Sequence, residues 1–248
     1  MESPTIASGK TLSTSFTKMR LEQPTDKFIT EILDEYSYLE EDELNGKLLK
    51  LFKEFNDDKN KFDVLIKVAS LNKIYATAIT NINPVVQQIN KIASQNYKLE
   101  KIDDYVDLVD KISNVKWTND KKEEFKRNNL SFASKYVHFL SDYKTPIYDS
   151  YVWIVIKGYF GQYKNRIMSF GNPKDYKEFY SIFEDFKKSF ELVKYSNYQI
   201  DKFLWTYGKS MIESIKEELQ ISLEKAKTEL KNRIKASSQQ TVGRYFYY

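Results

Sequence analysis

The sequence predicts an all-α protein, and three observations support this fold class. Apolar residues recur at spacings of three and four along most of the chain, as on the buried face of a helix. No stretch of any length alternates between apolar and polar residues, as a half-buried strand would. In addition, the 248 residues include only 7 glycines and 5 prolines, which favours long helices over many short strands.

The helical pattern begins near Thr25 and continues with few interruptions. Its first stripe contains Phe28, Ile32 and Tyr36, which lie on one face of a helix. Residues 61–80 are apolar nearly all round, so we expect this helix at the centre of a bundle. Apolar spacing and flanking Pro and Gly residues predict further helices at residues 44–55, 84–92, 99–112, 131–140, 149–156, 176–190, 201–208 and 211–236, and residues 117–129 are expected to form a charged, solvated helix.

The two ends of the chain differ from this pattern. Residues 1–22 are rich in Ser and Thr and lack periodicity, so we expect a flexible or loosely docked arm. The tail, residues 237–248, ends in an aromatic run beside Arg244, which can stack on nucleobases or else be docked or disordered. Between them, residues 23–236 form the predicted helical domain.

The composition excludes several classes of site. Cysteine is absent and His138 is the single histidine, so we expect no thiolate or multi-histidine metal site, and no cofactor. A net charge of +4 with an isoelectric point near 8.8 allows nucleic acid as a partner without requiring it. No segment has the apolar length of a membrane span, and the N-terminus lacks the apolar stretch of a secretory signal. We therefore expect a soluble cytoplasmic protein that makes no membrane contact.

The segment Ser131–Val152, SFASKYVHFLSDYKTPIYDSYV, contains the residues most suited to chemistry. It predicts a helix, a short connection with Pro146, and a second helix for which Asp149 is the N-cap or first-turn acceptor. Lys135 lies on a different side of the first helix from the apolar residues and is flanked by small side chains. A lysine in a partly apolar pocket loses proton affinity and becomes nucleophilic, and a nearby carboxylate can hold or accept its proton.

FASKYVHF followed by TPIYDSYV resembles the catalytic segment of the helix–hairpin–helix DNA glycosylases, in particular an 8-oxoguanine DNA glycosylase-like branch. In that family, a helix with a catalytic Lys is followed by a connection, a Pro-Val/Ile-x-Asp turn and the next helix, and Lys135 and Asp149 match the Lys and Asp positions. The resemblance covers roughly residues 60–160 and implies a multi-helix bundle of two interleaved helical subdomains. The family's glycine-rich hairpin before the Lys is absent, and residues 128–132 stand there instead.

The resemblance also implies a reaction in base excision repair. Lys135 would attack the anomeric carbon as a damaged or modified base, such as 8-oxoguanine, leaves an extruded nucleotide. Asp149 would stabilise the charge that develops on the sugar or take the Lys proton, and β-elimination from the Schiff base could cut the strand. Asn72, with Lys73, matches the position from which the family fills the gap in the DNA. Other expected contacts with the nucleic acid are Ser134, His138, Ser150 and Tyr151.

Each of these residues also has a purely structural interpretation. Lys135 could be a surface lysine, and Asp149 a helix cap worth roughly 1 kcal/mol. Asn72 and His138 could be packed, hydrogen-bonded side chains. For the whole protein, the alternative is a non-catalytic helical module of a bacterial defence-type system that binds nucleic acid or a protein. The near-heptad spacing in residues 211–236 favours such a module and allows a homodimer.

Overall fold

The computed structural model describes residues 18–95, 97–118 and 121–243, with side chains as far as Ser238. Within these ranges the chain forms ten helices and one two-stranded sheet, so the prediction of a mostly helical protein is confirmed. The elements are α1 (Asp26–Ser37), α2 (Glu40–Glu54), α3 (Lys61–Ile74), α4 (Asn83–Ser94), α5 (Ile102–Ser113), β1 (Asn114–Thr118), β2 (Glu124–Asn128), α6 (Leu130–Leu140), α7 (Ser150–Tyr163), α8 (Tyr176–Ser189), α9 (Asn197–Leu219) and α10 (Leu223–Gly243).

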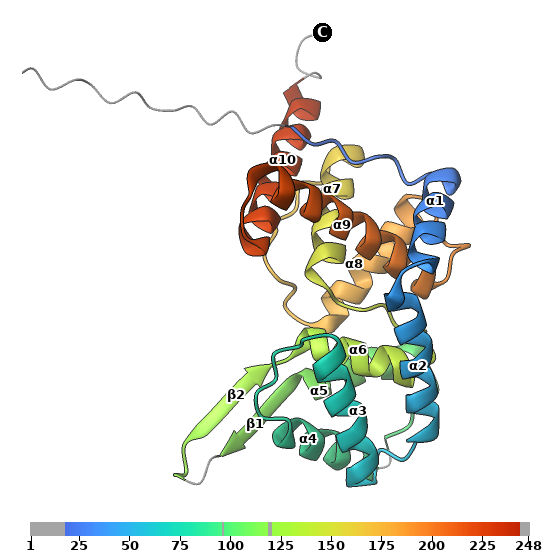
Figure 1. Ribbon diagram of the computed structural model, residues 1–248, viewed down its shortest axis with the longest axis vertical. Helices are drawn as coiled ribbons and strands as arrows, with labels where there is room; N and C mark the ends of the chain where they lie inside the picture. Colours follow the sequence, from blue (N-terminus) through green and yellow to red (C-terminus); the bar gives the residue numbers. More distant parts are fainter. Residues whose placement is uncertain (1–17, 96, 119–120, 244–248) are drawn as a thin grey trace, which may run out of the picture.

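The helices form two stacked halves with α6 between them (Figure 1). The lower half of this view contains α3, α4, α5 and the β1–β2 hairpin, and the upper half contains α7 to α10. α2 runs along one side of both halves and connects α1 to α3. Because α1 packs on α9, the first helix of the chain belongs to the same half as the last ones.

The helices α6 and α7 are buried on nearly every side. Every residue from Phe132 to Phe139 in α6 is buried, and so is every residue from Val152 to Gln162 in α7. A surface helix would keep one polar face in solvent. Two helices with no such face place their charged residues, Lys135 and Lys157, inside the protein.

Residues 114–128 form a β-hairpin, so the charged helix predicted at residues 117–129 was wrong. β1 and β2 pair antiparallel, in a register that places Lys116 opposite Lys126 and Trp117 opposite Phe125. The charged run DKKEEFKR offers no apolar stripe that could dock a helix, whereas the Trp117 and Phe125 rings stack across the strands with centroids 5.4 Å apart. Cross-strand aromatic packing therefore replaces helix packing in this segment.

The C-terminal helices have other bounds than the sequence predicts. α9 does not end near Gly208 but continues to Leu219, and the chain then turns at Gln220, whose φ of 52° is left-handed. Most apolar positions of the expected heptad seam are buried within the chain, where α9 and α10 pack on each other and on α7: Ile212, Ile215, Ala226, Leu230 and Ile234. Leu219 and Leu223, beside the turn between the two helices, are exposed and half-buried, respectively. The prediction of one continuous helix at residues 211–236 was therefore wrong, since the chain turns between Leu219 and Leu223. The homodimer stays a prediction.

Residues 18–22, the end of the expected flexible arm, are packed in place. Leu21 is buried, and its N–H donates to Oε1 of Gln162 in α7 at 2.8 Å. The N–H of Met19 donates to the carbonyl of Arg233 in α10 at 3.3 Å. This segment is thus a strap across the two helices and not part of a flexible arm.

Some of the remaining terminal residues are helical, and the others lie outside the described part of the chain. Residues 237–243 of the expected tail continue α10, whereas residues 1–17 and 244–248 lie outside the described residues. No helix in the described part of the chain is both long enough and apolar enough to cross a membrane.

The crossing of α9 over α7 depends on Gly208. A Cβ at this position would lie 3.0 Å from the Cβ of Tyr151 and 3.3 Å from its backbone carbonyl carbon, whereas a Cβ at Gly46 in α2 would meet nothing within 4 Å. In Gly208→Ala, overpacking of about 1–3 kcal/mol opposes a helix-propensity gain of roughly 0.5–1 kcal/mol. We expect the free energy of unfolding to fall by about 1 kcal/mol.

The matched control is Gly46→Ala, for which the same propensity gain should raise the free energy of unfolding by about 0.5–1 kcal/mol. Urea denaturation of both variants measures the difference. Equal stabilisation of the two variants would show that α9 can move away from α7 without loss.

Candidate active-site cavity

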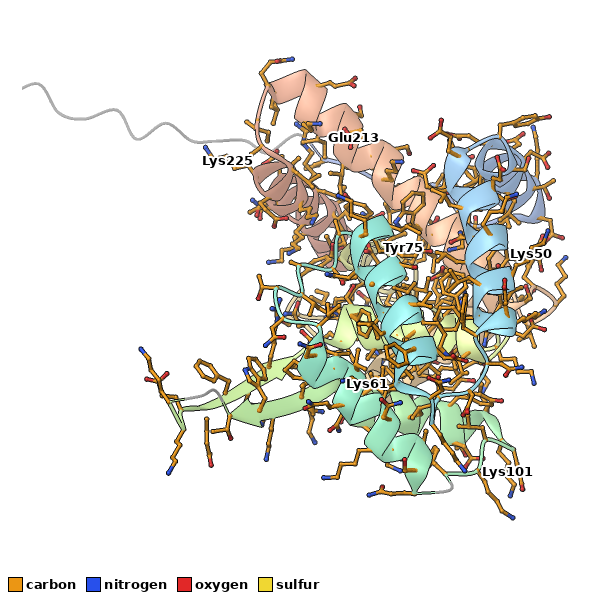
Figure 2. The ribbon with its side chains drawn as sticks, turned by 60° about the horizontal axis from the view of Figure 1, so that its bottom comes forward. Lys50, Lys61, Tyr75, Lys101, Glu213 and Lys225 are labelled. Carbon is orange, nitrogen blue, oxygen red and sulfur yellow. The ribbon has the colours of Figure 1, made fainter. Side chains whose placement is uncertain are left out.

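A cavity of about 480 Å³ lies between the two halves, within the size range of small-molecule sites. Its walls come from α1, α2, the end of α3, α6, the start of α7, α9 and the start of α10. Tyr75 and Ala76, which follow α3, form part of the lining, and Figure 2 shows Tyr75 at that end of the helix. Segments far apart in the sequence thus contribute to one site.

Lys135 lines this cavity from α6 and is only 5% exposed. Its Nζ donates to Oγ of Ser131 at 2.7 Å and lies 5.2 Å from the centre of the Tyr75 ring. Burial lowers the pKa of Lys135, and the carboxylates of Asp149 and Asp201 oppose this fall. A lowered pKa favours the neutral form of the amine, which is the nucleophilic one.

Asp149 lines the same cavity as the N-cap of α7. Its carboxylate accepts a hydrogen bond from the N–H of Tyr151 at 2.7 Å, which is the geometry of a helix cap. The side chain is half-buried, and the cap holds it in place at the cavity wall. The structure thus brings together the two residues that the sequence singles out for catalysis, Lys135 and Asp149.

Two hydrogen bonds clamp the turn that joins α6 to α7. The N–H of Tyr148 donates to Oγ of Ser134 at 3.0 Å, and the N–H of Ile147 donates to Oδ1 of Asp201 at 3.2 Å. Ser134 adjoins Lys135 and Tyr148 adjoins Asp149, so the first bond joins the backbone neighbours of the amine and the carboxylate. This clamp limits how far the two groups can separate.

Aromatic side chains form much of the remaining wall: Tyr36, Tyr75, Tyr151 and Trp205. The ring centroid of Trp205 lies 6.2 Å from that of Tyr36 and 6.5 Å from that of Tyr151. The side-chain amide of Asn45 links two of the hydroxyls, since it donates to Tyr36 and accepts from Tyr75. Burial raises the pKa of both phenols, so both stay protonated. A planar base could stack here, with roughly 1–3 kcal/mol per stacked base.

Asp201 and Lys202, near the start of α9, add a buried ion pair to the cavity. Their charged groups lie 3.1 Å apart, and Nζ of Lys202 is also 5.7 Å from the centre of the Tyr36 ring. Burial raises the pKa of Asp201, and the ammonium of Lys202 opposes this rise. From the sequence, these two residues are only the start of the helix predicted at residues 201–208. The sequence feature that could have identified the buried pair is two adjacent charged residues between the apolar residues Ile200 and Phe203.

Two further charged residues of the lining, Glu41 and Lys227, have partners of opposite charge. Nζ of Lys209 lies 2.7 Å from Oε1 of Glu41, and Nζ of Lys227 lies 2.8 Å from Oε1 of Glu224. The lining therefore carries acidic and basic groups in equal measure. Over the described ranges, no group of three or more His, Asp or Glu side chains could hold a metal ion.

Of the residues predicted to contact nucleic acid, Ser150 and Tyr151 line the cavity, whereas Asn72 and Lys73 do not. The side chain of Asn72 is engaged within the chain: it bonds both the N–H and the carbonyl of Ile79, at 3.0 and 2.9 Å, and accepts from the hydroxyl of Thr77 at 2.8 Å. In this structure Asn72 therefore holds the loop after α3. Lys73 is exposed beside it.

Ser134 and His138 are fully buried in α6 and do not line the cavity. Nδ1 of His138 donates to the carbonyl of Thr145, and within the described part of the chain its Nε2 has no hydrogen-bond partner. Burial lowers the pKa of His138 to about 3, so the imidazole is neutral. The prediction that these two residues contact nucleic acid was wrong, because α6 has no solvent-facing side at either position.

Comparisons with known proteins cover mainly the N-terminal half. A family model named HI_0787_N, described as an N-terminal domain, matches residues 27–144, from α1 to the turn after α6. An uncharacterized protein of Haemophilus influenzae is 29% identical over 160 residues, which are 62% of this chain and 71% of that protein. No solved structure gives a significant match. The region matched by the family model contains Lys135, whereas Asp149 and Asp201 follow it, so the cavity spans the boundary of that region.

The pKa of His138 predicts how stability depends on pH. The value is about 3 in the folded chain against an ordinary 6.5, so below pH 6.5 the unfolded chain binds a proton that the folded chain does not. This contribution to stability is complete above pH 6.5. As pH falls towards 3 it is lost, at up to about 1.4 kcal/mol per pH unit.

Because His138 is the single histidine, one variant isolates this effect. His138→Asn keeps an amide that can donate to the Thr145 carbonyl in place of Nδ1. We expect the variant to lose less free energy of unfolding than the wild type between pH 7 and pH 5, measured by urea denaturation. An equal loss of the free energy of unfolding in the variant and the wild type between pH 7 and pH 5 would contradict the assignment of this pH dependence to His138.

Proposed function

We propose that this chain is a DNA glycosylase-like enzyme that removes a damaged base, with Lys135 as its nucleophile and Asp149 as its catalytic carboxylate. One observation carries the proposal: a buried amine with a lowered pKa and a capped carboxylate line a single cavity with aromatic walls. The resemblance of FASKYVHF and TPIYDSYV to the helix–hairpin–helix glycosylases supports it independently. The proposal includes an 8-oxoguanine-like base and a glycosylase-type fold of two interleaved helical subdomains.

The first step is entry of the damaged nucleotide into the cavity. Extrusion from the duplex costs a few kcal/mol, less for a mispaired base. The rings of Tyr36, Tyr75, Tyr151 and Trp205 offset this cost, because they take the place of the neighbouring bases in the stack. The buried pair Asp201–Lys202 supplies an acceptor and a donor that a matching base edge can satisfy.

The second step is substitution at the sugar. The unprotonated Nζ of Lys135 attacks C1′, the C1′–N bond breaks, and the base leaves with the bonding electron pair and takes up a proton. The carboxylate of Asp149 stabilises the positive charge that develops on the sugar in the transition state. It then accepts the proton that the new C–N bond releases from Nζ.

The third step determines whether the strand is cut. Opening of the sugar ring turns the Lys135 adduct into a Schiff base, in which Nζ is doubly bonded to C1′. Loss of a proton from C2′ then expels the 3′ phosphate by β-elimination. Hydrolysis of the same Schiff base, without elimination, would return the enzyme and leave an abasic site.

Borohydride trapping tests the nucleophile. Reduction of the Schiff base should leave the wild-type chain covalently bound to duplex DNA that carries an abasic site or an oxidised guanine. Lys135→Gln, whose amide can still bond to Ser131, should give no adduct above background. The measurement is the fraction of protein shifted on a denaturing gel, followed by mapping of the modified peptide.

Lys157 is a matched internal control for this mapping. It is another buried lysine, with a pKa lowered by burial to about 8, but it lines a different cavity and donates to the carbonyls of Ser169 and Gly171. An adduct on Lys135 alone supports the proposal. An adduct on Lys157, or an undiminished adduct in Lys135→Gln, would sink it.

The role of Asp149 is tested by a pair of substitutions that separates its cap from its charge. Asn is as good an N-cap as Asp, so Asp149→Asn should keep the free energy of unfolding, whereas Asp149→Ala should lose about 1 kcal/mol. We expect both variants to form the adduct on the order of a hundredfold more slowly, the lower end of what acid–base catalysis contributes. Single-turnover trapping rates decide, and a wild-type rate in Asp149→Asn would assign the carboxylate to capping alone.

A further inference from the structure

The β1–β2 hairpin is the one element of Figure 1 that extends away from the helices. Its two faces differ, because side chains alternate along each strand. One face carries Val115, Trp117, Phe125 and Arg127, and the other carries Lys116 and Lys126 as directly opposed partners, with Asn114 and Asn128 on one side of them and Thr118 and Glu124 on the other. The hairpin therefore has an aromatic face and a basic face.

The aromatic face fastens the hairpin to the body of the protein. Val115 is buried, and Trp117 is half-buried in a small pocket that Pro84 and Val85 of α4 also line. The guanidinium of Arg127 donates to the carbonyl of Ala78 at 2.9 Å. With this face held against α4 and the loop after α3, the basic face points away from the body.

The basic face concentrates charge that the fold itself does not use. Lys116 and Lys126 are exposed, and neither is part of an ion pair among the described residues. Like charges directly opposite each other on one face of a sheet repel. A polyanion is the partner that such a pair suits, since neighbouring phosphates could neutralise the two ammonium groups.

The base of the hairpin is connected in two ways to elements that line the cavity. β2 leads through Asn129 into α6, the helix that carries Lys135. Through Arg127, the hairpin also contacts the loop after α3, whose first residues, Tyr75 and Ala76, line the cavity. A strand of five residues spans roughly 17 Å, so the basic face extends about that far from the base of the hairpin.

We propose that the β1–β2 hairpin is a second DNA contact, in which Lys116 and Lys126 bind backbone phosphates of the duplex beside the extruded nucleotide. The inference rests on the proposed function only in naming duplex DNA as the polyanion. It assigns the grip on the duplex to two lysine side chains in the segment just before residues 128–132, where the glycine-rich hairpin of the glycosylases is absent.

The test compares two double variants that remove the same charge from different places. Lys116→Gln/Lys126→Gln alters the basic face, and Lys50→Gln/Lys61→Gln removes exposed lysines from α2 and α3, away from the hairpin (Figure 2). Fluorescence anisotropy with a duplex of random sequence gives the dissociation constant at several salt concentrations. The thermal midpoint of the hairpin variant should equal or exceed that of the wild type, because a like-charge pair has been removed.

We expect the hairpin variant to bind on the order of tenfold more weakly at low salt, with a slope of log K against log salt reduced by about two. The control variant should keep most of the wild-type slope. Equal slopes for the two variants, or a wild-type chain that does not bind duplex DNA at low salt, would overturn the inference. A reduced slope together with no borohydride adduct would leave the hairpin contact standing and reject the glycosylase chemistry.

Discussion

The burial of α6 on all sides is the constraint on which the cavity depends. A helix enclosed between two halves has no face on which a charged side chain can reach bulk water, so Lys135 must find its partners inside. It has Ser131 on its own helix, the ring of Tyr75, and the fields of Asp149 and Asp201. These partners replace part of the hydration that the amine loses, yet burial still lowers its pKa. The fold thereby lowers the pKa of the amine, and the turn that leads to Asp149 places a carboxylate in the wall of the same cavity.

Charged groups in the interior of this protein lower its stability unless nearby groups compensate them. An unpaired ion in a protein interior is destabilising by several kcal/mol, and even a good ion pair seldom stabilises more than an apolar replacement would. Asp201 and Lys202 satisfy each other and the backbone of Ile147, which suits a structural role as well as a chemical one. Lys135 has a hydroxyl partner and no carboxylate within salt-bridge distance. Perturbed groups of this kind concentrate at functional sites, so Lys135 is a stronger candidate for chemistry than the Asp201–Lys202 ion pair.

The features of the fold and the site that could be predicted from the sequence are those that depend on residues close to one another in the chain. Helix periodicity and the cap at Asp149 depend on near neighbours, so the helices and the Lys135–Asp149 pairing could be inferred. The strands at residues 114–118 and 124–128 could not, since they are held by the stacking of Trp117 on Phe125 across the strands and by contacts of Val115 and Arg127 with the body of the protein. Gly208 suggested a helix end, whereas it permits a close crossing of α9 and α7. Tyr36, Trp205 and Asp201 enter the cavity only through the packing of α1 and α9, which no local pattern encodes.

The strap at residues 18–22 has a consequence for how the chain acquires its structure. Its partners in α7 and α10, Gln162 and Arg233, follow it by more than a hundred residues, so a long loop must close before either bond can form. During synthesis the strap is therefore made well before either of its partners. Leu21 therefore stays exposed to water until α10 has left the ribosome. The half that holds Asp149 is completed late, and contacts of such long range slow folding. Completion of this half thus waits for α10, although that helix contributes only Leu223 and Lys227 to the lining of the cavity.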